Sequence, residues 1–213
     1  VTKDAVENGG TLEIRTAKAG NAARYWLLRY TRPLISDVRN VASGVQVRWD
    51  VPAYATGYKI YRATGSSSTW KQVKHETSGK TASWVDTKVT NGIKYRYKVK
   101  ALYGGEESPL TPEGHRYRVV RPAKFTAKST KARKLTAAWS VNTRATGYQL
   151  CYATNKSFSN SRTLNISGSS SKSKTITGLS RGKKYYVKVR ACKKVGKESY
   201  FSAWSAVKLI RVK

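Results

Sequence analysis

Few residues in this chain have the types and the spacing that catalysis or metal binding requires. Its 213 residues include two histidines, His75 and His115, which lie far apart in predicted loops. Neither the histidines nor the two cysteines form a His-x-x-x-His or Cys-x-x-Cys pair at the spacing of a metal site. Hydrolysis of a glycosidic bond needs two placed carboxylates, whereas Glu106 and Glu107 are adjacent and point apart in an extended chain. We therefore expect no catalytic residues, no metal and no cofactor.

The residues that could bind a ligand are basic and occupy alternate positions in two segments. Alternate residues of a β-strand lie on one face of a sheet, so each segment predicts a strip of positive charge. The main strip could bind a polyanion and contains Lys184, Tyr186, Lys188 and Arg190. A secondary basic strip consists of Lys94, Arg96, Lys98 and Lys100. Trp70 is a more isolated aromatic residue, which either contacts a sugar ring or packs against the edge of its own sheet.

The formal net charge of +31 is extreme and unevenly distributed. Residues 122–213 alone contain 21 lysines and arginines, and Glu198 is their only acid. Such a field attracts polyanions and weakens with added salt. The candidate partners are therefore teichoic acid, sulfated or sialylated glycans, anionic lipid and nucleic acid. The alternative is a highly soluble surface that binds nothing in particular.

The clearest feature of the chain's organisation is an internal repeat with a constant offset of 90 residues. In the first copy it comprises Trp49, Ala55–Tyr58, Ala63–Thr64, Gly92, Tyr95, Val99 and Ala101. In the second copy these residues recur as Trp139, Ala145–Tyr148, Ala153–Thr154, Gly182, Tyr185, Val189 and Ala191. A repeat of this length matches one small domain used twice. Tandem small modules serve display, spacing or binding more often than catalysis.

Within each copy the hydrophobic pattern has a period of two and almost no helical signal. Short alternating runs are separated by turn-rich stretches such as Gly65-Ser66-Ser67-Ser68 and Gly168-Ser169-Ser170-Ser171. Alternation marks strands with one buried face, and short strands with regular turns predict β-sandwiches. We therefore predict an all-β protein made of two tandem sandwiches.

The boundaries of the copies are predicted from prolines. Pro lacks a backbone donor and ends strands, and Arg32-Pro33 and Arg121-Pro122 each stand in front of one copy. We therefore place the copies at residues 34–121 and 122–213. Residues 1–33 are either the last strand of a preceding, truncated module or an arm packed on the first copy.

The residues held in both copies resemble the fibronectin type III domain. A Trp that ends one strand, a Gly-Tyr that opens the next and a Gly-x-x-Tyr-x-x-x-Val-x-Ala strand occur in that order in each copy. The resemblance covers residues 34–213 and implies immunoglobulin-like sandwiches. It also implies that Tyr95 and Tyr185 form tyrosine corners, each phenol bonded to backbone upstream. The chain is most similar to the Lys-rich versions in surface proteins of Gram-positive gut bacteria.

A second resemblance concerns Phe201-Ser202-Ala203-Trp204-Ser205. This segment is similar to the Trp-Ser-x-Trp-Ser box of cytokine-receptor fibronectin modules, with Phe in place of the first Trp. In that family the aromatic rings stack between basic side chains, which implies that Phe201 and Trp204 interleave with Lys188 and Arg190. We expect no such box in the first copy. The same residues thus support two interpretations, a structural cation–π stack and a polyanion-binding strip.

Cys151 and Cys192 are the only cysteines of the chain. Their neighbours Leu150 and Ala191 are predicted to point inward, so both thiols should face outward on one sheet. Antiparallel pairing places Cys192 near Gly147, about four residues or ~13 Å from Cys151 at ~3.3 Å per residue. This exceeds the ~7 Å limit between the Cα atoms of a disulfide, so we predict two free thiols.

These observations favour a non-catalytic segment of a secreted or cell-wall-attached bacterial protein. The chain starts with Val and contains no Met, so we expect it to be a piece of a larger protein. We expect a spacer and adhesion module whose partner is an anionic cell-wall polymer or a host glycan. The alternatives are specific recognition of a host protein, such as a mucosal glycoprotein or immunoglobulin, and an accessory role beside an extracellular hydrolase.

No apolar run approaches the ~20 residues of a membrane span, so we expect no membrane insertion. Nucleic acid is disfavoured for an exported fragment, and we expect a monomer.

Overall fold

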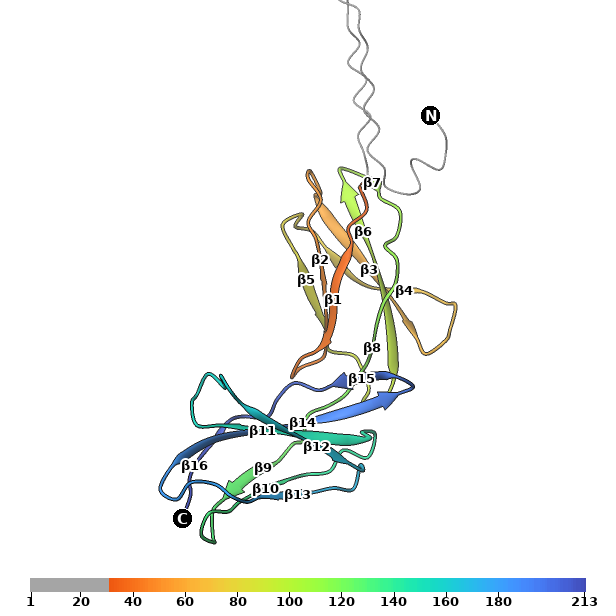
Figure 1. Cartoon of the computed structure of the whole chain (residues 1–213). Helices are drawn as coiled ribbons and strands as arrows, with labels where there is room; N and C mark the ends of the chain where they lie inside the picture. Colours follow the sequence, from red (N-terminus) through yellow and green to blue (C-terminus); the bar gives the residue numbers. More distant parts are fainter. Residues whose placement is uncertain (1–30) are drawn as a thin grey trace, which may run out of the picture. The chain divides into compact units, whose positions relative to one another are not determined.

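The computed structural model describes residues 31–213. In that range the chain forms strands β1 to β16 and no helix, so it contains no helix long and apolar enough to cross a membrane. The strands form four sheets, which make up two β-sandwiches (Figure 1). The segment predicted at residues 1–33 lies outside the described residues, apart from its last three.

The first sandwich pairs a three-stranded sheet with a five-stranded sheet. The three-stranded sheet has the order β1-β2-β5 and is formed by β1 (Ile35–Asn40), β2 (Val45–Trp49) and β5 (Ser83–Asp86). The second sheet has the order β4-β3-β6-β7, and β8 also pairs with β6. Its strands are β3 (Gly57–Thr64), β4 (Lys71–Glu76), β6 (Lys94–Tyr103), β7 (Glu106–Glu107) and β8 (Gly114–Tyr117).

The second sandwich repeats this arrangement strand for strand. Its three-stranded sheet has the order β13-β10-β9 and is formed by β9 (Phe125–Lys128), β10 (Leu135–Trp139) and β13 (Ser173–Ile176). Its five-stranded sheet has the order β12-β11-β14-β15, and β16 also pairs with β14. The strands are β11 (Gly147–Ala153), β12 (Arg162–Ser167), β14 (Lys184–Val195), β15 (Glu198–Phe201) and β16 (Lys208–Arg211). The predicted all-β fold of two tandem sandwiches is confirmed, while the exact boundary at residue 121 stays a prediction.

The core of each sandwich is made by the residues that the repeat holds in common. Trp49 packs against Tyr58 with ring centroids 5.3 Å apart, and Trp139 packs against Tyr148 in the same way at 5.4 Å. Strands β6 and β14 alternate between buried and more exposed residues, because one face lies on this core and the other forms the outside of the sheet.

A tyrosine hydroxyl fixes the turn before each of these long strands. The Tyr95 hydroxyl accepts a hydrogen bond from the Thr90 N–H at 2.9 Å, and the Tyr185 hydroxyl accepts one from the Ser180 N–H at 3.2 Å. Both tyrosines are buried. The tyrosine corners that the family resemblance implied are therefore confirmed in both sandwiches.

Replacing Tyr95 with phenylalanine is expected to lower the free energy of unfolding of the first sandwich by about 1–2 kcal/mol. The ring stays, but the Thr90 N–H loses its acceptor in a part-buried place. Chemical denaturation measures the loss. The control is Tyr54→Phe, because the Tyr54 side chain is 87% exposed. An equal effect of the two substitutions would contradict a role for the corner hydroxyl.

Candidate functional site

The outer face of strand β14 is the candidate site, and strand alternation builds it. Tyr185, Val187, Val189 and Ala191 are buried in the core, so the residues between them face outward. Strand β14 lies inside the sheet, with β11 on one side and β15 and β16 on the other. The neighbouring strands and loops therefore decide which side chains surround its cations.

Two of these cations lie between aromatic rings. Lys188 Nζ is 3.7 Å from the ring centroid of Phe158 and 4.9 Å from that of Trp204. Arg190 Cζ is 4.3 Å from the ring centroid of Trp204 and 4.0 Å from that of Phe201. The order Phe158–Lys188–Trp204–Arg190–Phe201 is one continuous stack, which we call the β14 ladder. The predicted interleaving is confirmed, and Phe158 extends it by a ring that was not predicted.

Two serines, Ser202 and Ser205, position Trp204 in the β14 ladder. The Ser202 hydroxyl accepts a hydrogen bond from the Ala191 N–H, and the Ser205 hydroxyl accepts one from the Val189 N–H, both at 3.0 Å. The N–H groups of the serines donate in return to the carbonyls of the same two residues, at 3.0 and 2.8 Å. We call this pair the serine clamp. It satisfies the backbone of β14 beyond the end of β15 and holds the intervening Trp204 beside the strand.

Phe158 comes from the loop between β11 and β12. Its φ of 58° is in the left-handed region, which is uncommon for a residue other than glycine. The Asn155 side chain fixes the loop, because its amide donates to the Ser159 carbonyl at 2.8 Å and its Oδ1 accepts from the Ser159 N–H at 3.1 Å. Asn at the start of a Ser-rich stretch is a signal for such a turn, but it does not indicate which cation the Phe158 ring covers.

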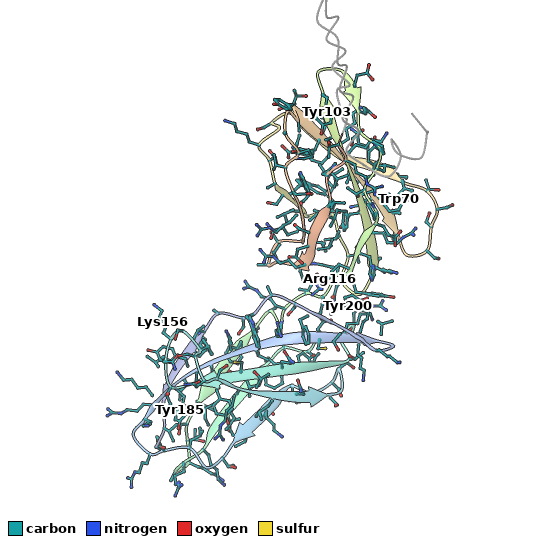
Figure 2. All side chains as sticks on the ribbon, turned by 45° about the horizontal axis from the view of Figure 1, so that its top comes forward. Trp70, Tyr103, Arg116, Lys156, Tyr185 and Tyr200 are labelled. Atoms are coloured by element: carbon teal, nitrogen blue, oxygen red, sulfur yellow. The ribbon has the colours of Figure 1, made fainter. Side chains whose placement is uncertain are left out.

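Trp70, labelled in Figure 2, is the aromatic residue of the corresponding loop in the first sandwich. It lies just before β4, and its ring centroid is 4.8 Å from Lys98 Nζ and 5.2 Å from Arg96 Cζ. Lys98 and Lys188 are equivalent in the internal repeat, so each copy covers this lysine with an aromatic residue from the corresponding loop. Trp70 thus packs on its own sheet, which was one of its two predicted roles.

Acids neutralise part of the secondary basic strip on β6. The Glu107 carboxylate accepts hydrogen bonds from both Lys59 and Lys100, the latter at 3.1 Å. Arg96 forms an ion pair with Glu113 at 3.0 Å. Lys59, Lys100 and Arg96 are therefore engaged by acids, whereas the β14 ladder engages its cations with rings.

Glu107 and Phe201 occupy the same place in the two sheets. Glu107 of β7 pairs with Leu102, and Phe201 of β15 pairs with Cys192, which is the repeat equivalent of Leu102. Glu107 holds Lys100 by an ion pair. Phe201 holds Arg190, the repeat equivalent of Lys100, by stacking.

The first copy also contains a counterpart of the serine clamp. Ser108 and Thr111 follow Glu107 at the spacing at which the two serines follow Phe201, and their hydroxyls accept hydrogen bonds from the N–H groups of Ala101 and Val99, both at 3.0 Å. The expectation that the first copy has no such box was wrong for the hydroxyl positions. Only the aromatic positions are specific to the second copy. The motif is identified by its rings, so it offered no sign of the hydroxyl positions in the first copy.

Stability of the first sandwich should depend on pH through Glu107. Hydrogen bonds from Lys59 and Lys100 lower the pKa of the Glu107 carboxyl below its ordinary value of 4.5. A lowered folded-state pKa gives stability that is complete above the ordinary pKa and is lost as the pH falls through the folded-state value. Glu107→Gln should therefore destabilise the protein at about pH 6 and do so less at about pH 3. Denaturant unfolding at both pH values measures this, with Glu106→Gln at the exposed neighbour as control. A pH-independent difference would contradict the linkage.

The remaining members of the two strips lie at the beginning of their strands. Lys184 is exposed and lies directly opposite Arg211 of β16, and Tyr186 is half-buried opposite Leu209. Lys94 is half-buried at the first position of β6. The main strip thus has two parts. Lys188 and Arg190 belong to the β14 ladder, and Lys184 and Tyr186 lie outside it at the beginning of β14.

Arg190 is the most enclosed cation of the β14 ladder. Its Nε donates to Gln149 Oε1 at 2.9 Å, and Gln149 Nε2 donates to Asn165 Oδ1 at 2.8 Å. Burial lowers the pKa of the Arg190 guanidinium from its ordinary value. Arg190 is thus contacted by two aromatic rings and by the Gln149 amide.

The two thiols lie where the sheet register was predicted to place them. Cys192 is directly opposite Gly147 and Cys151 is directly opposite Lys188, so the cysteines are four positions apart and both are free. Burial raises the pKa of the Cys192 thiol. Cys151 is only 4% exposed although its parity places it on the outer face, which we attribute to the β14 ladder above it.

The titratable residues do not gather into a metal site in the part of the chain that the structure describes. No group of three or more His, Cys, Asp or Glu residues there could hold a metal ion. His75 is exposed and His115 is half-buried, and the prediction that both lie in loops was wrong, because they lie on the strands β4 and β8.

Two amylopullulanases are similar over short stretches. The enzyme of Thermoanaerobacter thermohydrosulfuricus is 35% identical over 86 residues, which is 39% of this chain and 6% of the enzyme. The enzyme of Thermoanaerobacterium saccharolyticum is 36% identical over 68 residues, which is 32% of this chain and 5% of the enzyme. The chain therefore matches only a small part of each enzyme.

The chain also resembles two solved structures and one family model. The FN1–FN3 domains of chicken CNTN1 are 18% identical with a TM-score of 0.38, over 85% of this chain and 68% of that one. A two-domain fibronectin type III segment of chicken tenascin is 16% identical with a TM-score of 0.42, over 85% of this chain and 99% of that one. The family model of the fibronectin type III domain matches residues 120–208, and the first sandwich has the same strand order as the second. The chain thus has the fold of two tandem fibronectin type III β-sandwiches.

Proposed function

We propose that this chain is a non-catalytic segment of an extracellular bacterial protein and that it retains this protein at an anionic polymer of the cell wall or of a host glycan surface. The observation that carries the proposal is the charge of the second sandwich. Of its 21 lysines and arginines, Lys188 and Arg190 are used in the β14 ladder, and Glu198 is the only acid in residues 122–213.

A folded surface with this charge favours polymers over small ions. Each sandwich has its own core, so its cations are displayed from fixed strands and turns. A polyanion that contacts several of them releases several counterions, which makes binding strong at low salt and weak at high salt. The β14 ladder serves this function indirectly, because it stabilises a sheet whose outer face would otherwise be destabilised by like charges.

Salt-dependent retention tests the proposal. The protein is applied to immobilised wall teichoic acid, mucin and heparin, and to neutral dextran as the control. We expect retention on the anionic columns alone, with affinity falling at least about tenfold between about 50 and 200 mM NaCl. Elution from the anionic and neutral columns at the same salt concentration would contradict the proposal.

A second candidate function is an accessory role beside an extracellular hydrolase. The matches to two amylopullulanases support it. In this role the segment should bind an insoluble neutral polysaccharide by stacking and hydrogen bonding, which salt weakens little. A pull-down with insoluble polysaccharide at about 1 M NaCl separates this role from the first. Failure to bind under these conditions would remove polysaccharide binding as the basis of an accessory role.

A further inference from the structure

A polar hollow lies on the three-stranded sheet of the second sandwich, away from the β14 ladder. Its volume is about 300 Å³. It is lined by three threonines and two lysines, Thr130, Lys131, Lys134, Thr136 and Thr175, whose side-chain polar groups are hydroxyl and ammonium groups. We call it the Thr–Lys hollow. All of these groups can donate hydrogen bonds, which suits an anion.

The floor of the Thr–Lys hollow is made by strand pairing. Thr136 of β10 lies directly opposite Thr175 of β13, and their hydroxyl oxygens are 3.0 Å apart. Lys128 of β9 lies opposite Thr136 on its other side. Leu135 and Ala137 are buried, so Thr136 faces outward. The row Lys128–Thr136–Thr175 thus places a cation and two hydroxyls on one outer face.

The turn that supplies the two lysines of the hollow is held by several backbone contacts. The Ser129 hydroxyl donates to the Lys134 carbonyl at 2.7 Å and accepts from the Lys213 N–H at 3.0 Å. Arg133 has a left-handed φ of 56°. Its N–H donates to the Lys213 carbonyl at 2.7 Å, and its carbonyl accepts from the Leu179 N–H at 3.1 Å. A turn fixed in this way loses little entropy when a ligand binds.

The Thr–Lys hollow is specific to the second copy. At the repeat offset of 90 residues, the first copy has the uncharged residues Asn40, Val41, Gly44, Gln46 and Val85 in these places. The one acid of residues 122–213, Glu198, lies on β15 in the other sheet. The divergence between the copies therefore created a hydroxyl-lined cationic hollow with no acid on its own sheet.

We propose that the Thr–Lys hollow binds a phosphate or sulfate group carried by an anionic polymer. Two ammonium groups supply charge-assisted hydrogen bonds, and the threonine hydroxyls supply neutral donors at fixed positions. This inference rests on the proposed retention at anionic polymers and names the place on the second sandwich where one group of the polymer is held.

Matched variants separate a site from general charge. Lys131→Gln with Lys134→Gln removes two charges from the hollow, and Lys156→Gln with Lys197→Gln removes two charges from exposed residues that do not line it. Thr136→Val with Thr175→Val removes two hydroxyls and no charge. The probes are poly(glycerol phosphate), dextran sulfate and, as the carboxylate control, polygalacturonate. Affinities are measured by calorimetry at one salt concentration.

We expect the hollow lysine pair to weaken phosphate or sulfate polymer binding roughly tenfold more than the control pair does. The threonine pair should weaken it by about threefold or more with folding unchanged in circular dichroism. The phosphate and sulfate arms show which group is preferred. Equal effects of the two lysine pairs, or no effect of the threonine pair, would overturn the hollow but leave charge-driven retention intact. If the unaltered protein binds none of the three polymers, retention itself fails, so the two failures are distinguishable.

Discussion

Replacing both Ser202 and Ser205 with alanine is expected to lower the free energy of unfolding of the second sandwich by about 2–5 kcal/mol. The two hydroxyls accept hydrogen bonds from the N–H groups of Ala191 and Val189, residues that are fully buried. Alanine leaves these donors without that acceptor, and an orphaned buried donor costs about 1–3 kcal/mol. A domain is stable by only about 5–15 kcal/mol, so the double variant would lose a large fraction of its stability.

Hydrogen exchange localises this loss. The amides of Val189 and Ala191 should exchange at least about tenfold faster than in the unaltered protein, while the equivalent amides of Val99 and Ala101 keep their protection. The mirror variant, Ser108→Ala with Thr111→Val, should move the loss to the first sandwich. Where the double variant folds too poorly to measure, Ser202→Ala alone should show about half of the effect. Unchanged protection at Val189 and Ala191 would mean that the serine clamp does not bear on stability.

The fold could be predicted from the sequence because the internal repeat is a repeat of core positions. Trp49 and Trp139, with Tyr58 and Tyr148, make the same ring contact in each sandwich. Core residues must fit their neighbours closely, so they keep both their types and their offset. The register of Cys192 opposite Gly147 followed from the same regularity of antiparallel strands.

The candidate site could be predicted where it follows strand alternation or the Phe-Ser-Ala-Trp-Ser segment, but not where it lies in the loop between β11 and β12. Lys188 and Arg190 follow the period of two, but Phe158 comes from a loop and has a left-handed backbone, which no period predicts. The equivalence of Glu107 and Phe201 was missed because the hairpin of the second copy is longer. Their partners Leu102 and Cys192 keep the offset of 90 residues, whereas Glu107 and Phe201 are 94 apart. A comparison at constant offset therefore aligns the wrong residues.

The equivalence of Glu107 and Phe201 explains how the second copy tolerates its positive charge. In the first sandwich Glu107 holds Lys100 by charge, which neutralises one cation. In the second, Phe201 holds Arg190 by stacking and leaves its charge in place. An aromatic residue in place of an acid thus keeps a cation ordered without reducing the net positive field. The substitution allows a stable sheet and a strongly cationic surface in the same domain.

Replacing Trp204 with alanine is expected to cost the second sandwich about 2–3 kcal/mol and to expose the Cys151 thiol. The Trp204 ring is half-buried and contacts both Lys188 and Arg190. Its removal separates the two halves of the β14 ladder. Cys151 lies directly opposite Lys188, so opening of the ladder should make this thiol reactive. In a Cys192→Ser background the reaction with a disulfide reagent reports Cys151 alone, and its rate should rise by about tenfold or more, because ~1.4 kcal/mol of local stability is a factor of ten in opening.

The control is Trp70→Ala, which removes the ring that covers Lys98 in the first sandwich, where there is no cysteine. It should lower stability by a similar amount and leave the rate at Cys151 unchanged. A loss of stability in Trp204→Ala with Cys151 still protected would show that the sheet covers the thiol without the β14 ladder. A thiol that already reacts freely in the Cys192→Ser background would show that the ladder is open much of the time, and Lys188 and Arg190 would then be available to a polyanion. The same rate therefore decides between the structural and the binding interpretation of these two cations.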